Sequence, residues 1–292
     1  MVNRKLLKKF ETVVQDKKRT IIMGVINLSL DSFSKDGTQD KTQIYTQVKS
    51  FIENGADIID LGAQSSRPVN TAKMESSIFG EKWGVESSEI FAEKEMEILL
   101  PIVDFLVEEF DVLLSIDTCR SNVAHESLVH GASIINDIWG LKYDAEIAKV
   151  VSQYEGKLVI MHNQENNIYN SMLTDVAKSL LDSVNVAKIN GLKQNDIILD
   201  PGFGFGKNVQ QNLTLLNHLD YFSQLGYPLM IGTSRKSAIG SVLNLPIDDR
   251  LEGTAATIAV AIVKGVDIVR IHDVVSIAKI VKMTDAIIRG ID

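Results

Sequence analysis

The 292-residue sequence has a single cysteine, Cys119, and no long hydrophobic run. One cysteine excludes an intramolecular disulfide, a pattern typical of a reducing compartment, and we expect a cytoplasmic protein. No apolar run approaches the ~18 residues of a membrane-spanning helix, so no membrane association is expected. Apolar residues make up 45% and charged residues 23%, which excludes the disordered, collagenous and disulfide-scaffold classes.

An excess of positive charge is also lacking, since 30 Lys and Arg face 38 Asp and Glu. A net charge of −8 argues against a nucleic-acid partner. Residues 1–19 nevertheless hold seven basic and two acidic side chains. This segment has no apolar core of a targeting peptide, although a targeting role stays open. Its apolar residues recur at helical spacing and favour a short amphipathic helix. They are Leu6, Leu7, Phe10, Val13 and Val14.

Short apolar, β-branched runs recur along the chain, each followed by polar residues or glycine. Their spacing of about 35 residues is the length of one strand-plus-helix unit. Continuous apolar runs are typical of strands that are buried on both faces of a parallel sheet. The eight predicted strands are Ile21–Ile26, Ile58–Leu61, Val112–Ile116, Ser133–Ile135, Leu158–Met161, Ile197–Leu199, Leu229–Ile231 and Ile268–Ile271.

The segments between these runs favour helices, several of them followed by a glycine at the expected C-cap position. Strands and helices in eight alternating units predict a (β/α)₈ TIM barrel, formed as one domain by residues 1–292 and preceded by the short N-terminal helix. A doubly wound open sheet is the competing arrangement. The predicted helices are Thr42–Glu53, Glu93–Glu108, Ser121–Val129, Ala145–Ser152, Asp175–Ala187, Thr254–Lys264 and Val275–Ile288.

One predicted connection is much longer than the two to six residues that are usual between a strand and its helix. It follows the second strand, runs from Val69 to Phe91, and mixes glycine, serine, Trp83 and charged residues. It is either a neutral surface insertion or a lid over the site.

Polar residues follow every predicted strand, and in a barrel the active site lies at the carboxyl ends of the strands. Asp117, Asn136 and Asp200 are carboxylates and a carboxamide, which can match the alternating donors and acceptors of a flat heterocycle. The strand ends therefore predict a site for a planar polar ligand.

Other strand ends carry groups suited to phosphate. Lys236, Arg270 and His272 offer cationic donors for phosphate oxygens. Asn27 and Asp31 offer oxygen ligands of the kind that a phosphate-bound Mg²⁺ accepts while it keeps several waters. These residues do not by themselves identify the substrate.

Three features invite other interpretations. Gly202, Gly204 and Gly206 fit neither nucleotide-binding glycine pattern, and a tight turn that brings backbone close to a ligand is favoured. His162 has no metal-ligand spacing with another histidine, which favours a hydrogen-bonded structural role. Cys119 is better interpreted as a packed small side chain than as a nucleophile.

The strand-end motifs together resemble the dihydropteroate synthases, in the order of that family, from about residue 20 to residue 285. One motif alone is weak, but eight in the order of the family are specific. The motifs are Ile22-Met23-Gly24-Val25-Ile26-Asn27, Asp31-Ser32-Phe33-Ser34, Ser115-Ile116-Asp117-Thr118, Ile135-Asn136-Asp137, Met161-His162-Asn163, Leu199-Asp200-Pro201-Gly202 with Gly204-Phe205, Thr233-Ser234-Arg235-Lys236-Ser237 and Val269-Arg270-Ile271-His272-Asp273.

The resemblance implies an Mg²⁺-dependent transferase of folate biosynthesis and a target of sulfonamides. The amino group of 4-aminobenzoate would displace diphosphate from 6-hydroxymethyl-7,8-dihydropterin diphosphate. The resemblance also implies a homodimer.

The same resemblance implies residue roles. Asp117, Lys236 and Asp31 would be catalytic, and Asn27 would bind the metal. The pterin would be held by Asp117, Asn136, Asp200 and Lys236, and the diphosphate by Arg270 and His272. The aminobenzoate pocket would be shaped by Phe33, Pro68 and Ser237 under two loops, Asp31 to Gly37 and Ser65 to Pro68. Further substrate contacts would come from Ser66, Arg67, Met161 and Phe205.

The sequence departs from the family pattern on the aminobenzoate side. Ser29-Leu30 replaces the usual Thr-Pro, Gln64 replaces a glutamate, and Val69 replaces a glycine. The pterin and diphosphate positions are intact. We therefore expect ordinary pterin binding and an altered affinity for aminobenzoate or for sulfonamides.

Two other functions remain open. A pterin-dependent methyltransferase would share the barrel and the pterin contacts, but it needs no diphosphate site such as Ser234-Arg235-Lys236 with Arg270 and His272. A non-catalytic pterin-binding paralogue is the second alternative, and the intact polar strand ends argue against it.

Overall fold

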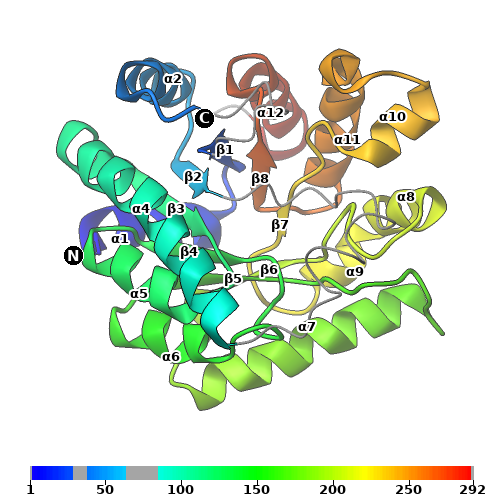
Figure 1. Cartoon of the computed structure of the whole chain (residues 1–292). Helices are drawn as coiled ribbons and strands as arrows, with labels where there is room; N and C mark the ends of the chain where they lie inside the picture. Colours follow the sequence, from blue (N-terminus) through cyan, green and yellow to red (C-terminus); the bar gives the residue numbers. More distant parts are fainter. Residues whose placement is uncertain (1, 29–37, 64–84, 291–292) are drawn as a thin grey trace.

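A sheet of eight parallel strands lies at the centre of the protein, and the helices surround it (Figure 1). The computed structural model describes residues 2–28, 38–63 and 85–290, apart from the side chains of residues 85–91. Each strand lies within two residues of its predicted position at both ends. The strands are β1 (Ile21–Asn27), β2 (Ile58–Gly62), β3 (Leu113–Asp117), β4 (Ile134–Asp137), β5 (Lys157–Met161), β6 (Ile197–Asp200), β7 (Met230–Ile231) and β8 (Ile268–Ile271).

The sheet curls into a nearly closed barrel. Its strand order is β6-β5-β4-β3-β2-β1-β8-β7, so the two ends of the list are β6 and β7. These two strands meet through a parallel bridge between Leu199 and Leu229, and the amide of Leu199 donates to the carbonyl of Pro228 at 2.9 Å. The predicted TIM barrel is confirmed, and the open doubly wound sheet is excluded.

All the helices predicted by range are present, and three further helices, α8, α9 and α10, were not among them. The helix after β2 also begins at Val85, so the residues from Val85 to Phe91 are helical and the predicted long connection is shorter than expected. This stretch contains Glu86 and Glu89, and glutamate is a good helix former. The α-helices are α1 (Arg4–Asp16), α2 (Lys41–Glu53), α4 (Val85–Glu109), α5 (Ser121–Val129), α6 (Glu146–Gln153), α7 (Met172–Ile189), α8 (Val209–Asn217), α9 (Leu219–Ser223), α10 (Ser237–Leu243), α11 (Leu251–Val263) and α12 (Val274–Arg289).

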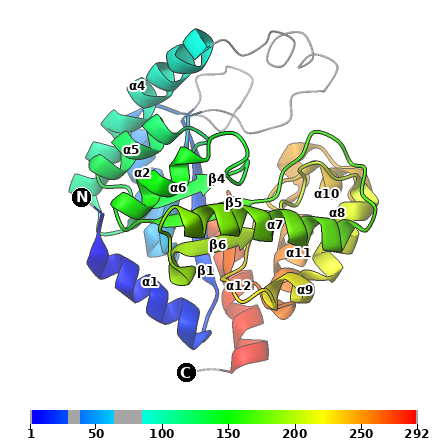
Figure 2. The same cartoon turned by 90° about the horizontal axis from the view of Figure 1, so that it is seen from below.

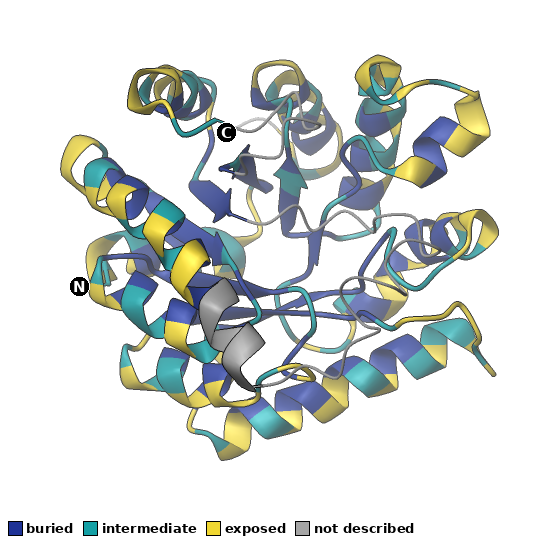
Figure 3. Ribbon diagram, viewed as in Figure 1, coloured by how far each residue is buried: buried dark blue, intermediate teal, exposed yellow. Residues whose placement is uncertain are grey.

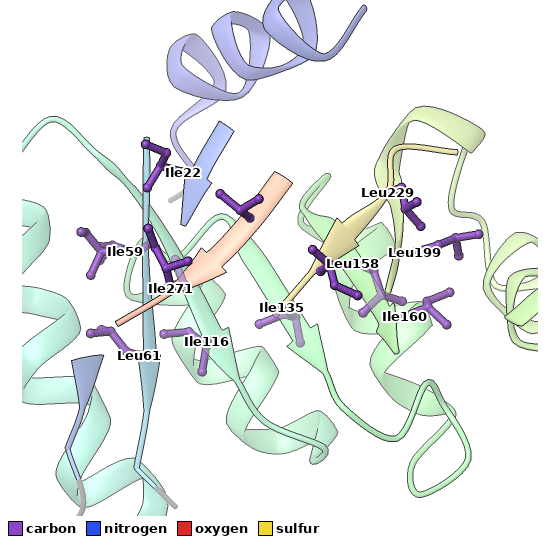
Figure 4. Close-up of a cluster of buried hydrophobic side chains, with 14 of the residues drawn as sticks. Ile22, Ile59, Leu61, Ile116, Ile135, Leu158, Ile160, Leu199, Leu229 and Ile271 are labelled. Carbon is purple, nitrogen blue, oxygen red and sulfur yellow. The ribbon is translucent and has the colours of Figure 1, made fainter. Parts of the chain in front are cut away.

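The alternation of side chains along each strand divides the core into two layers. Figure 3 shows the strands buried and the exposed side chains on the outer faces of the helices. One set of strand residues points outward and packs under the helices, for example Ile59, Leu61 and Ile116 (Figure 4). The other set, including Ile58 and Leu113, points into the barrel.

Helix α1 is the amphipathic helix that the sequence predicted, and it closes the amino-terminal end of the barrel (blue in Figure 2). It begins after Asn3, whose side chain accepts a hydrogen bond from the amide of Leu6 at 3.1 Å. Leu7 and Phe10 are buried against the inward residues at the starts of the strands, including Ile134. This end of the barrel is therefore an apolar core.

The inward positions change from apolar to polar along each strand. Ile58 is followed two residues later by Asp60, and Ile268 by Arg270, in the same inward direction. The parallel register aligns these changes, because Asp60 pairs with Ser115. The polar inward side chains thus meet at the carboxyl end of the barrel.

Within the described residues no helix is both long and apolar enough to cross a membrane.

We expect Phe10→Ala to lower the free energy of unfolding by about 3–5 kcal/mol, because it removes a buried aromatic ring from the closed end of the barrel. The nearby exposed residue gives a control, since Lys9→Ala should change the free energy by less than about 0.5 kcal/mol. Urea denaturation of both variants measures the difference. Equal stability of the two variants would contradict the packing role of α1.

Candidate active site

The guanidinium of Arg270, on β8, joins two carboxylates inside the carboxyl end of the barrel. Its Nε donates to Oδ2 of Asp60 on β2 at 2.7 Å, and its Nη2 donates to Oδ2 of Asp117 on β3 at 2.8 Å. The side chains of both aspartates are almost wholly buried, with 0% and 7% exposed. Burial opposes ionisation of Arg270, but Asp60 and Asp117 outweigh it and raise the pKa of the arginine. Arg270 therefore stays a cation between them.

Asp117 and Lys236 both have pKa values shifted toward neutrality. Burial raises the pKa of Asp117 to about 7; Arg270 opposes this shift, and the charges of Asp60 and Glu95 reinforce it. Burial also lowers the pKa of Lys236 to about 7, with help from Arg270 and against Asp200 and Asp117. Perturbed titrations of this kind are frequent at functional sites. The protonation states of Asp117 and Lys236 can therefore change near pH 7 when a charged ligand binds.

Three polar atoms in the barrel interior have no hydrogen-bond partner among the described residues. They are Oδ1 of Asp60, Oδ1 of Asn136 and Oγ of Ser115, on the adjacent strands β2, β4 and β3. The amide nitrogen of Asn136 contacts Oδ2 of Asp60 at 3.5 Å. Buried polar groups in proteins are usually hydrogen-bonded. These atoms therefore offer acceptors and a hydroxyl to a polar ligand in the barrel.

The second predicted pterin carboxylate, Asp200, ends β6 opposite Met161 of β5. Burial raises the pKa of Asp200, and a hydrogen bond from the amide of Gly202 to its Oδ1, at 2.7 Å, opposes the rise. Nζ of Lys236 lies 3.9 Å from the ring centroid of Phe205, a cation–π contact. The structure thus brings Phe205 to Lys236 beside the β6 end.

The glycines after β6 form the tight turn that the sequence predicts. Gly202, Gly204 and Gly206 have φ angles of +73°, +86° and +54°, in the left-handed region that favours glycine. A Cβ atom on Gly202 would lie 1.9 Å from the carbonyl oxygen of His162, so no other residue fits there. The turn therefore lies directly against the end of β5.

His272 follows β8 and lies beside Ser234. Its backbone amide donates to Oγ of Ser234 at 3.2 Å, and its Nδ1 lies 3.1 Å from the same oxygen. Burial and then Arg270 lower the pKa of His272 to about 3. The imidazole is therefore neutral near pH 7, where the sequence suggested a cation, and it can offer a phosphate a neutral N–H group.

Arg235 and Ser237 flank Lys236, and Arg235 is held in an ion pair whereas Ser237 is exposed. The guanidinium of Arg235 binds both carboxylate oxygens of Asp273, at 2.9 and 2.6 Å. Its carbonyl accepts from Nη1 of Arg250 at 2.9 Å. Arg235 therefore connects the residues after β7 to those after β8. Ser237 begins α10 and is exposed at the mouth of the barrel.

Asn27, at the end of β1, is the residue expected to bind Mg²⁺. In the described part of the chain, no group of three His, Cys, Asp or Glu side chains is placed to hold a metal ion. The carbonyl of Asn27 accepts from the amide of Thr38 at 3.1 Å, whereas its side chain has no hydrogen bond to a described residue. A single carboxamide oxygen suits a hard cation that keeps waters and takes further oxygens from a substrate.

A buried ion pair, not predicted from the sequence, lies behind Asp117. Nη1 of Arg120 and Oε2 of Glu95, on α4, are 2.7 Å apart, with the two side chains only 7% and 2% exposed. Burial raises the pKa of Cys119, next to Arg120, to about 12. Cys119 is therefore a thiol at neutral pH, which supports its interpretation as a packed side chain rather than a nucleophile.

Several predicted site residues lie outside the described residues. They are Asp31, Phe33, Ser66, Arg67 and Pro68, and the departures at Ser29, Leu30, Gln64 and Val69 lie there too. The expected change in aminobenzoate or sulfonamide affinity therefore stays a prediction.

Two residues of the site were missed by the sequence analysis. Asp60 lies within the predicted strand Ile58–Leu61, and Lys207 follows the predicted glycine turn, but neither was given a role. The signal for Asp60 was its position two residues after an inward apolar residue, Ile58. No local pattern pointed to Lys207, because its partners come from β5 and from the turn itself.

Comparisons with known proteins agree with this geometry. The family model for pterin binding enzymes matches residues 23–77 and 78–272. The dihydropteroate synthase of Clostridium beijerinckii is 43% identical over 274 residues, which cover 93% of this chain and 96% of that enzyme.

Solved structures agree as well. That of the dihydropteroate synthase of Clostridium difficile, in the presence of pteroic acid, has a TM-score of 0.82 at 39% identity, over 93% of this chain and 98% of that chain. That of the Xanthomonas albilineans enzyme, with 4-aminobenzoic acid, has a TM-score of 0.79 at 28% identity, over 92% and 93%. The chain therefore belongs to the pterin-binding enzyme family and, within it, to the dihydropteroate synthases.

Proposed function

We propose that this transferase of folate biosynthesis joins 6-hydroxymethyl-7,8-dihydropterin diphosphate to 4-aminobenzoate, forming 7,8-dihydropteroate and diphosphate. The observation that carries the proposal is the buried set of Arg270, Asp60 and Asp117 next to Lys236, at the carboxyl end of the barrel. The ligands of the two solved relatives support it, since pteroic acid contains a pterin joined to an aminobenzoate.

The polar strand ends suit a pterin ring. The ring presents an amino group and a ring N–H as donors on one edge, and a carbonyl as an acceptor beside them. Asp200 offers carboxylate oxygens to the donors, Lys236 offers an N–H donor to the acceptor, and Oδ1 of Asn136 offers one more acceptor. Buried polar groups without partners carry a free-energy cost of desolvation, and a ligand that forms these hydrogen bonds offsets that cost.

The chemistry requires stabilisation of charge more than a strong base. The C–O bond between the pterin methylene and diphosphate breaks, and a C–N bond to the arylamine forms. The methylene carbon gains positive charge as diphosphate leaves, and the ionised carboxylate of Asp117 stabilises that charge. The arylamine is a neutral nucleophile near pH 7, and its proton leaves to solvent after the C–N bond has formed. No residue has to remove that proton first.

Diphosphate departure calls for cations and N–H donors at the mouth of the barrel. Lys236 supplies an ammonium, and His272 supplies a neutral N–H beside Ser234. Asp60 and Asp117 use two of the five N–H donors of Arg270, so its other donors and its charge can act on diphosphate. We propose that Asn27 holds Mg²⁺, which would neutralise the phosphate oxygens when bound.

We propose that the protein is a cytoplasmic homodimer with no nucleic-acid or membrane partner. Exposed apolar side chains on α11 and α12 support a dimer, because Val260, Val263, Met283 and Ile287 are 41–70% exposed. Apolar surface of this kind is typical of interfaces between subunits. Sedimentation equilibrium gives the subunit number, and a monomer at micromolar concentration would contradict the dimer.

The reaction is tested by measuring diphosphate release with each substrate and Mg²⁺ present or omitted. We expect release only when both substrates and Mg²⁺ are present. Lys236→Ala should lower kcat/KM at least about 100-fold, because it removes a preorganised donor from the site. The exposed Lys178→Ala on α7 is the control and should match wild type. Pterin binding without any release would instead indicate a non-catalytic paralogue.

The pH dependence gives a second test, since Asp117 must be ionised and its carboxylate shares Arg270 with Asp60. Asp60→Asn removes a like charge that raises the pKa of Asp117, so that pKa should fall. The acid limb of kcat/KM should therefore shift to lower pH by about one unit.

Asp57→Asn is the matched control for this shift. Asp57 lies at the other end of β2, where it pairs with Arg19 at 2.6 Å. The acid limb should stay at its wild-type position in this variant. An acid limb that moves to higher pH in Asp60→Asn would contradict the assigned role of Asp117.

A further inference from the structure

The ammonium group of Lys207 makes three hydrogen bonds in the turn between β6 and α8. Its Nζ lies 3.0 Å from the carbonyl oxygen of Gly202, 3.0 Å from that of Phe205, and 3.0 Å from Nδ1 of His162. Burial lowers the pKa of Lys207 to about 7, and the charge of Asp200 opposes this shift. In its charged form the amine has three N–H donors, and these three acceptors use all of them. Lys207 therefore has no donor left for a substrate.

His162 must be neutral for this arrangement, with its Nδ1 free to accept. Burial, Lys207 and then Lys142 lower the pKa of His162 to about 2, so the ring is neutral at any pH at which the protein is assayed. Its proton then lies on Nε2. His162 is thus the hydrogen-bonded structural residue that the sequence favoured, and its partner is a buried lysine.

Other side chains hold the rest of the turn. The amide of Gly204 donates to Oδ1 of Asn212 at 2.6 Å, and the hydroxyl of Tyr169 donates to the carbonyl of Gly206 at 2.7 Å. The amide of Phe205 donates to the carbonyl of Gly202 at 3.2 Å. The turn therefore has one fixed backbone path, and Lys207 binds it at two carbonyls.

The turn forms the wall on which Lys236 rests. The ring of Phe205 lies under Nζ of Lys236, and a Cβ atom on Gly204 would come within 2.9 Å of Cδ of Lys236. The charge of Lys207 also lowers the pKa of Asp200, which favours the ionised carboxylate. Two groups of the site, Lys236 and Asp200, thus depend on where Lys207 holds the turn.

We propose that Lys207 is a positioning residue for the reaction, which acts by fixing the β6–α8 turn and, through Phe205, the position of the Lys236 ammonium. The expected kinetic effect rests on the proposed function. The contacts of Lys207 with the turn and with His162 can be tested without it. Lys207 contacts neither substrate.

The chain offers a matched control at the other end of the barrel. Lys157 is also a buried lysine with three partners, which are Glu11, Asp196 at 2.9 Å and the carbonyl of Asn195 at 3.1 Å. It begins β5, whereas His162 follows the end of that strand. Lys157→Met and Lys207→Met therefore remove equivalent groups, but only Lys207 is next to the site.

The experiment compares kinetics and thermal stability of the two variants. Both should be less stable than wild type. Lys207→Met should lower kcat/KM roughly 10–100-fold, with a higher KM for the pterin diphosphate, because displacement of binding groups by about 1 Å is enough for such a loss. Lys157→Met should keep the wild-type KM and kcat. An unchanged kcat/KM in Lys207→Met, or an equal loss in both variants, would overturn the proposal.

A readout without turnover separates this inference from the proposed function. Nitrogen-15 NMR of the histidine rings should show His162 as the Nε2–H form in wild type. In Lys207→Met the Nδ1 resonance of His162 should move at neutral pH, because the hydrogen bond between Lys207 and this nitrogen is lost. If wild type releases no diphosphate, the proposed reaction fails while this spectrum still decides the contact. An Nδ1 resonance that stays at its wild-type position would overturn it. If Lys207→Met does not fold, Lys207→Gln takes its place with the same readouts.

Discussion

The rest of the site depends on one ionic contact, the guanidinium of Arg270 held between Asp60 and Asp117. Two buried carboxylates so close together would repel each other, and the arginine between them makes the arrangement stable. The contact joins β8 to β2 and β3 across the barrel. It leaves Asp117 close to its titration point, because Arg270 stabilises the ionised form while burial and Asp60 oppose it. A carboxylate in this state can respond to charge that develops in a ligand.

The two ends of the barrel divide stability from function. At the amino-terminal end, α1 covers apolar residues, and the charge of Lys157 is fully matched by its partners. At the carboxyl end, polar atoms of Asp60, Ser115 and Asn136 have no partner among the described residues, and several pKa values are shifted. Both ends are lined by the inward residues of the same strands. Along each strand these residues change from apolar to polar within two residues.

Much of this could be predicted from the sequence, because strand burial and strand-end chemistry are local. The strand positions and the closeness of Asp117, Lys236 and Arg270 follow from short patterns and parallel topology. What could not be predicted depends on distant partners. The expected contact of Arg270 with diphosphate stays a prediction, but its two carboxylate partners from other strands were not predicted. His272 was expected to be a cation, but its burial beside Arg270 makes it neutral.

Burial and Asp60, opposed by Arg270, hold Asp117 near its titration point. Carbon-13 NMR of labelled aspartate carboxyls, assigned by difference from Asp117→Asn, measures the pKa of Asp117 most directly. We expect a titration of Asp117 coupled to Lys236, with an apparent pKa of about 7. A pKa near the ordinary aspartate value of about 4 would contradict it.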